Sequence, residues 1–234
     1  MSKVTLALLI SPLTAAAAFS TVALTYSALA RLQAALPILI GAALYCPLHF
    51  YLPRNRFFYV LSHELSHALA ALASGVKVKK IKIGKTGGYV ALNSTNAFIS
   101  LAPYFIPFYA LATGLTYGLA AFFLNMSAYR PFFTGAAGFF LAFHLLNTGD
   151  ILTGPVQSDL KKAGGVFFSI SLVLLLNSLC LALTLKMIFP DLVSLRIYAA
   201  EVCNVTGAIA GWVFTTASYL FRSLFNTAKM YLNA

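Results

Sequence analysis

Long apolar runs set the main limit on what this sequence can fold into. A helix needs about 17–25 apolar residues to cross the hydrocarbon core of a bilayer, and seven runs reach that length. Only 9% of the residues are charged, whereas a soluble domain has about a quarter. The sequence therefore predicts an all-α polytopic membrane protein with six or seven transmembrane helices. The runs are 4–30, 32–52, 57–74, 97–124, 132–152, 166–189 and 197–221.

The last run leaves the number of helices at six or seven. Arg196, Glu201 and Asn204 all lie near its start, and a helix with polar residues at one end can lie on the membrane surface instead of crossing it. The chain has no internal repeat and no low-complexity linker. We expect one membrane-embedded domain, with N-terminal helices in 1–56, a catalytic core in 57–176 and C-terminal helices in 177–234.

The formal net charge of +11 indicates the lipid bilayer as a partner. Most basic residues lie in short gaps between the apolar runs, where Lys and Arg meet lipid headgroups. No nucleic-acid-binding module accompanies the charge, which argues against nucleic acid. The three cysteines, Cys46, Cys180 and Cys203, lie far apart and indicate neither a disulfide framework nor a cysteine metal site.

The segment 76–92 differs from the apolar runs. Valines and isoleucines alternate with lysines, and Gly84, Gly87 and Gly88 supply a turn, a pattern typical of a β-hairpin. Its lysine side must face water or headgroups, because an exposed sheet edge is untenable inside lipid. By the number of its lysines, this hairpin is the better candidate for the cytoplasmic side.

A His-Glu-x-x-His motif stands inside the third apolar run. His63 and His67 lie one helical turn apart on the same face, a spacing that lets two imidazoles bind one zinc ion. Glu64 can reach the attacking water as a general base. Ionisable residues deep in a bilayer cost about 2.5–3.5 kcal/mol each on insertion scales, so three together indicate function. The competing interpretation is a polar cluster that joins helices by hydrogen bonds.

A catalytic zinc site generally has three protein ligands and one position for water. His49 precedes a helix end and is predicted to be interfacial, whereas Asp191 and Glu201 lie at a turn and in the doubtful last run. The remaining candidates for the third ligand are His144, Asp150 and Asp159. The residues alone leave these three open.

The motif within an apolar helix, together with the runs 59–88 and 101–107, resembles the site-2 protease family of intramembrane metalloproteases, in its compact M50B-like bacterial branch. The likeness covers most of 57–176. In that family an Asp on a later helix completes the zinc site. The separation favours Asp159, 92 residues beyond His67, over Asp150, 83 residues beyond it. The family's usual Leu-Asp-Gly is replaced here by Gln-Ser-Asp-Leu.

The resemblance also implies how a substrate binds. A hairpin after the motif helix can receive an unwound substrate as an added strand, which corresponds here to the hairpin in 76–90. Asn147 is a further candidate, which can hydrogen-bond the substrate or join helices. The hairpin residues predicted to bind substrate are Val76, Val78, Ile81 and Ile83.

The expected activity is that of an intramembrane zinc metalloprotease. Zinc would be bound by His63, His67 and Asp159, with Glu64 as the base, and the substrates would be peptide bonds in or near transmembrane segments. We expect a multi-pass integral protein of the cell or plasma membrane. The alternative is a zinc-binding membrane scaffold or transporter without proteolysis, which the metal content and activity of a Glu64→Gln variant would distinguish.

Overall fold

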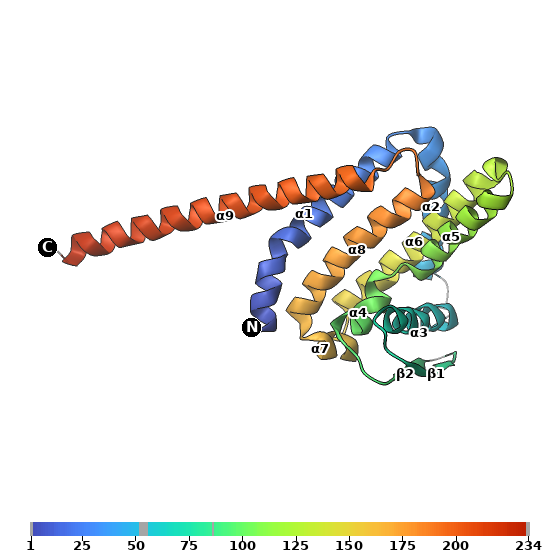
Figure 1. Cartoon of the computed structure of the whole chain (residues 1–234), viewed down its shortest axis with the longest axis horizontal. Coiled ribbons are helices and arrows are strands. Elements are labelled where there is room, and N and C mark those ends of the chain that lie inside the picture. Colours follow the sequence, from blue (N-terminus) through green and yellow to red (C-terminus); the bar gives the residue numbers. More distant parts are fainter. Residues whose placement is uncertain (1, 52–55, 86, 233–234) are drawn as a thin grey trace.

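The computed structural model describes residues 2–51, 56–85 and 87–232. The fold is mostly helical with one two-stranded antiparallel sheet (Figure 1), which confirms the helical class and the predicted hairpin. The elements in chain order are α1 (Lys3–Leu29), α2 (Leu32–Tyr51), α3 (Arg56–Ala73), β1 (Val78–Ile83), β2 (Gly88–Leu92), α4 (Ala97–Phe105), α5 (Phe108–Phe123), the short 3-10 helix η1 (Ser127–Tyr129), α6 (Arg130–Thr153), α7 (Ser158–Ala163), α8 (Val166–Ile188) and α9 (Leu195–Leu232).

Small residues bring α2 and α6 close together. A Cβ atom at Gly41 would collide with the main chain of Gly135, and one at Gly138 would collide with the main-chain carbonyl of Ile38. Small residues allow such close approach of helices in membrane proteins. The α2–α6 pair forms one wall of the molecule, and α1 packs along α8 in another.

Three helices are long and apolar enough to cross a membrane among the described residues: α1, α8 and the part of α9 in Leu195–Asn226. The pair α4 and α5 adds a fourth if the two, bent by 75°, form one broken span. The count is lower than the six or seven predicted. The helix α3 carries the ionisable motif, and α6 carries polar residues such as Asn147 and Asp150, which lower the apolar character of both helices. The part of α2 in Ala35–Tyr51 is apolar but shorter.

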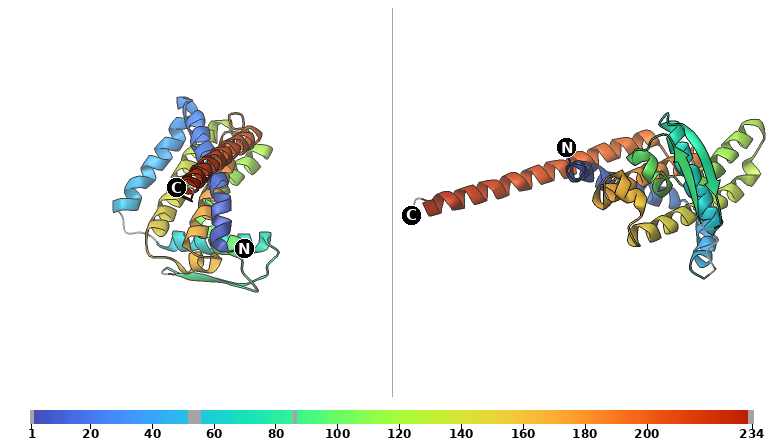
Figure 2. Two further views of the ribbon diagram at one scale, coloured as in Figure 1. Left: turned by 90° about the vertical axis from the view of Figure 1, so that its left-hand side faces the viewer. Right: turned by 90° about the horizontal axis from the view of Figure 1, so that it is seen from below.

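The last apolar run forms part of one 38-residue helix, α9. It extends away from the other helices (Figures 1 and 2). Large apolar side chains along it, such as Trp212, Phe214 and Phe221, are exposed. In length and composition this helix is suited to a membrane.

A buried cluster joins α3, α4, α7 and α8. Leu101 and Tyr104 of α4 pack with Leu160 and Ala163 of α7 and with Val173 of α8. The α4 helix begins at Asn96, whose side chain accepts a hydrogen bond from the Ile99 amide, a favourable N-cap. This cluster fixes the short helix α7 against α4, and α4 in turn contacts α3.

The hairpin lies across α3 at one end of the helices (Figure 2). Its strands pair with Ile83 opposite Gly88 and Lys82 opposite Tyr89. Cross-strand partners share a face of a sheet. The Gly88 face is turned toward α3, because a Cβ atom added at Gly88 would lie 2.9 Å from Val60 Cγ1.

Candidate metal centre

The two motif histidines project from α3 one turn apart, as the sequence predicts. The ring centroids of His63 and His67 are 4.8 Å apart, and the rings are nearly perpendicular. Their side chains are 16% and 14% exposed. Both rings are therefore partly sheltered yet reachable by a small ligand.

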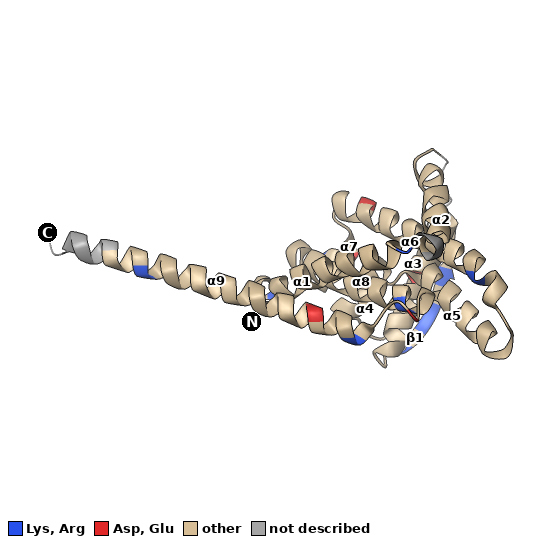
Figure 3. Ribbon diagram, turned by 90° about the horizontal axis from the view of Figure 1, so that it is seen from above, with Lys and Arg blue, Asp and Glu red and all other residues tan. Residues whose placement is uncertain are grey.

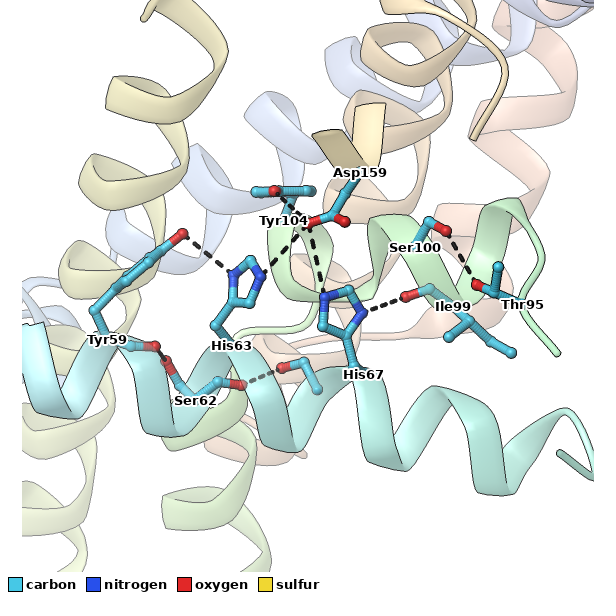
Figure 4. Close-up of polar contacts among 10 residues, drawn as sticks. Tyr59, Ser62, His63, His67, Thr95, Ile99, Ser100, Tyr104 and Asp159 are labelled. Carbon is cyan, nitrogen blue, oxygen red and sulfur yellow. Dashed lines mark hydrogen bonds and ion pairs between the residues drawn. The ribbon is translucent and has the colours of Figure 1, made fainter. Parts of the chain in front are cut away.

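Asp159 of α7 reaches both histidines (Figure 4). Its Oδ2 atom lies 3.7 Å from Nε2 of His63 and 3.8 Å from Nε2 of His67. One potential ligand atom from each of the three residues lies within 4.8 Å of the other two. In the described part of the chain this is the single group of three His, Cys, Asp or Glu residues that fits a metal ion.

The far nitrogen of each ring has a hydrogen-bond partner. Nδ1 of His67 donates to the main-chain carbonyl of Ile99 at 2.8 Å, and Nδ1 of His63 lies 3.3 Å from the Tyr59 hydroxyl. Partners of this kind hold a ring so that its other nitrogen can bind metal. Here both Nε2 atoms are directed toward Asp159.

The Asp159 carboxylate is itself held in place. The Tyr104 hydroxyl donates to Oδ2 of Asp159 at 3.1 Å. Burial by itself raises the pKa of the Asp159 carboxyl, but the nearby imidazoles of His63 and His67 and the hydrogen bond from the Tyr104 hydroxyl outweigh burial and keep the pKa below its ordinary value. The group is therefore a carboxylate at neutral pH, the form in which it can bind a cation.

This set of donors fits zinc. Two imidazole nitrogens and one carboxylate oxygen are a common ligand set of catalytic zinc, which leaves the fourth position for water or substrate. The hydrogen bonds to the far side of each ring and to the carboxylate are those expected around such a site. The chemistry of His63, His67 and Asp159 is thus sufficient for a metal centre.

Glu64 lies beside this centre, beneath the hairpin. The residue is 6% exposed. A Cβ atom added at Gly88 would lie 2.8 Å from Cγ of Glu64 and 2.6 Å from the main-chain oxygen of Lys82. Only glycine fits between the strand and the acid, so β2 packs directly on Glu64.

A cavity of about 900 Å³ borders the centre. His63, Glu64 and Asp159 form one side, and the turn residues Gly87 and Gly88 reach it from the hairpin. The volume is ample for several residues of an extended peptide. Much of the remaining lining is aromatic: Tyr45, Phe58, Tyr59, Tyr104, Tyr109, Phe139, Phe140 and Phe143.

The other two candidates for the third ligand have different partners. Asp150 Oδ2 lies 3.1 Å from Nε2 of His49 on α2, and Nε2 of His144 lies 2.9 Å from Oδ1 of Asn177 on α8. Neither belongs to the group around His63. Of the three acids and histidines left open by the sequence, the fold brings Asp159 to the motif.

Asn147, a candidate from the sequence, is one of the residues that line the cavity. Its Nδ2 atom donates to the Tyr45 hydroxyl at 2.9 Å and to the Phe143 carbonyl at 2.7 Å. The amide thus joins α6 to α2 and also faces the space where a substrate would lie. The hydrogen bonds correspond to the helix-joining role, and the substrate-binding role stays a prediction.

The four selected hairpin side chains lie away from the cavity. Val76 and Val78 pack on the buried cluster around α4, and Ile83, paired with Gly88, shares the hairpin face that is turned toward α3. Ile81 pairs with Val90 on that same face and is 40% exposed. The hairpin borders the cavity through its glycines instead.

The sequence did not single out three residues that contribute to this region. Tyr59 contacts the candidate ligand His63, and Tyr104 contacts the candidate ligand Asp159. His49, predicted to be interfacial, is buried at 5% exposure and paired with Asp150. Tyr59 lies four residues before His63, so helical spacing was a usable signal for it. His49 and Tyr104 reach the cavity only through packing.

No protein-family model, curated protein or solved structure matches this chain.

Proposed function

We propose that this chain is a membrane-embedded zinc metalloprotease of the site-2 protease type that hydrolyses peptide bonds in or near transmembrane segments. One observation carries the proposal. Oδ2 of Asp159 lies 3.7 and 3.8 Å from the Nε2 atoms of His63 and His67, beside the buried acid Glu64. A polar cluster that only joins helices would not require a base next to three potential zinc ligands.

His63, His67 and Asp159 would hold the metal. Zinc bound by them would act as a Lewis acid on the peptide carbonyl and would make water a better nucleophile near neutral pH. The Ile99 carbonyl orients His67 through a hydrogen bond, and the Tyr104 hydroxyl orients Asp159 in the same way, before the metal binds. The protein thus contributes a ligand set that is already oriented.

Glu64 would act first as a general base and then as a general acid. Its carboxylate accepts a proton from the attacking water and passes it to the nitrogen of the leaving amine, as general acid–base catalysis requires. Contact with Gly88 restricts the side chain on the hairpin side. Glu64 and Asp159 both line the cavity, so the base and the ligand face the same substrate space.

The cavity supports a substrate that is apolar and locally unwound. Its aromatic lining suits large apolar side chains of a transmembrane segment, and an intact helix would hide the carbonyl to be attacked. The main chain at Gly87 and Gly88 borders the cavity and offers hydrogen-bonding groups to an extended segment. We place the protein in a cell or plasma membrane as a multi-pass protein, in keeping with its long apolar helices.

The test uses the full chain, purified in mild detergent and reconstituted with a panel of single-span membrane proteins. Wild type should hold one zinc ion per chain and cleave at least one panel member. Glu64→Gln should keep the zinc and lose cleavage by about 100-fold or more, since a positioned general base contributes about that much. The measurements are elemental analysis for zinc and mass spectrometry of the products.

The other outcomes separate the alternatives. Zinc in both proteins without cleavage in either would favour a zinc-binding scaffold or transporter. No zinc in wild type prepared without chelator would reject the metal centre. Equal cleavage by wild type and Glu64→Gln would reject Glu64 as the base.

A further inference from the structure

Lysines gather at one end of the molecule. The hairpin, the short helix α7 and the start of α1 lie together at the same end in Figure 1, and β1 stands out as a basic strand in Figure 3. All eight lysines of these elements are exposed. We call them the lysine face: Lys3, Lys77, Lys79, Lys80, Lys82, Lys85, Lys161 and Lys162.

The pairing of the two hairpin strands shows which lysine side chains point away from the protein. Lys80 pairs with Ala91 and Lys82 pairs with Tyr89. These pairs alternate along the hairpin with the pair of Ile83 and Gly88 and its neighbour, whose side chains are turned toward α3. Side chains alternate between the two faces of a strand. Lys80, Lys82 and Tyr89 therefore point away from the protein.

The start of α1 adjoins the same region. The Lys3 side chain passes within 3.0 Å of the position of a Cβ atom on Gly164, just after α7, and its ammonium lies 5.0 Å from the centre of the Phe168 ring in α8. The helices α1 and α8 are both long and apolar enough to span a membrane. Both therefore begin at the lysine face.

The charge of this face is not neutralised within the described part of the chain. The ion pairs there join histidines to Asp150 and Asp159, and Arg130 to Asp191, and none involves a lysine of the face. Asp159 faces the two motif histidines, and Glu64 is buried under the hairpin. The eight ammonium groups therefore attract anions from outside the protein.

We propose that the lysine face binds the headgroups of anionic phospholipids in the cytoplasmic leaflet. Two apolar helices that begin beside this face would hold it at the depth of the headgroups. Attraction between exposed charges acts over a Debye length of about 8 Å at physiological salt. Lysines at the depth of the headgroups lie within this distance of the lipid charges. An excess of Lys and Arg marks the cytoplasmic side of a membrane protein.

The proposal gives the candidate metal centre an orientation. The helix α3 lies between the hairpin and the rest of the helices, and α7 carries both Asp159 and two lysines of the face. The centre would then lie near the cytoplasmic surface of the membrane, within reach of water. The inference does not depend on proteolysis, and its test uses lipid binding alone.

The test measures lipid selectivity of the full chain in nanodiscs. Spin-labelled phosphatidylglycerol and spin-labelled phosphatidylcholine are compared by the fraction of label immobilised by the protein. Wild type should prefer phosphatidylglycerol. Each lysine near an anionic surface contributes about a fivefold gain in binding. The triple variant Lys79→Gln, Lys80→Gln and Lys82→Gln should therefore lose most of this preference. Added salt should weaken the preference of wild type.

A matched control removes three exposed charges elsewhere: Arg31→Gln, Arg196→Gln and Arg222→Gln. This variant should keep the preference of wild type. Replacing the same three hairpin lysines by Arg should also keep it, which shows that charge is responsible and that the hairpin tolerates substitution. Circular dichroism should give equal helix content for all variants.

Four results would overturn the proposal. The first is equal immobilisation of the two lipids by wild type, and the second is an unchanged phosphatidylglycerol preference in the hairpin variant. The third is an equal loss of this preference in the hairpin and control variants. The fourth is binding of RNA in place of lipid by the lysine face. The orientation has its own check. A membrane-impermeant amine reagent should label Lys79, Lys80 and Lys82 in inside-out vesicles and not in intact cells, and the reverse pattern would reject the cytoplasmic assignment.

Discussion

The Tyr104 hydroxyl donates to Oδ2 of Asp159 at 3.1 Å, and this is the same oxygen that faces Nε2 of both His63 and His67. Tyr104 is 2% exposed, and its main-chain carbonyl accepts a hydrogen bond from Asn177 at 2.6 Å. The tyrosine is thus fixed at both ends. It links the third candidate ligand to the interior of the helix bundle.

Replacing Tyr104 by Phe should weaken zinc binding by about 10–100-fold, the usual effect of losing a partner of a metal ligand. The ring would still fill its buried position, so the fold should persist. Zinc affinity is measured by competition with a chelating dye. Tyr109→Phe is the control, because the Tyr109 hydroxyl donates to the Phe58 carbonyl and borders the same cavity. Equal zinc affinity in Tyr104→Phe and wild type would contradict this role.

Asp159→Asn should lose zinc on dialysis against a mild chelator, whereas Asp150→Asn should retain it. The first change removes a negative charge next to the two ring nitrogens. The second acts on a carboxylate that is paired with His49 instead. Elemental analysis after dialysis gives the result. The opposite pattern would transfer the ligand role to Asp150, and loss in neither variant would point to His144.

Gly88→Ala should lower proteolytic turnover while zinc content stays normal. The added methyl group would meet Glu64 Cγ and the Lys82 carbonyl, so either Glu64, the proposed base, or the strand must shift. Small displacements of catalytic groups cost about 100-fold in rate. Gly118→Ala on α5 is the control, since nothing lies within 4 Å of its Cβ position and the residue does not line the cavity. Equal turnover of the two variants would show that β2 does not set the position of Glu64.

Gly138→Ala should destabilise the protein. The new methyl group would collide with the Ile38 carbonyl of α2, and forcing extra atoms into a packed interior costs about 1–3 kcal/mol. The check is the midpoint of thermal unfolding in detergent. Gly118→Ala on α5 has open space around it and should leave the midpoint unchanged or raise it, because alanine favours a helix over glycine. A midpoint for Gly138→Ala at or above wild type would mean that α2 and α6 can separate without cost.

Features that depend on neighbours along the chain were predictable from the sequence. The placement of His63 and His67 on one face follows from the helical repeat, and the hairpin follows from alternating residues and the glycines at its turn. The apolar runs fixed the helical class for the same reason. All of these depend on residues a few positions apart.

Features that depend on packing between distant segments were decided by the tertiary structure. Leu160 and Ala163 hold α7 against α4, and this contact brings Asp159 to the motif while Asp150, nine residues earlier, turns to His49. The residues alone left the two acids open, because Asp159 lies on the short helix α7, which can present it in any direction until the helix packs; the separation from His67 favoured Asp159 only through the family resemblance. The close fit of Gly88 on Glu64 has the same origin, since it joins a strand to a helix with no local pattern in common.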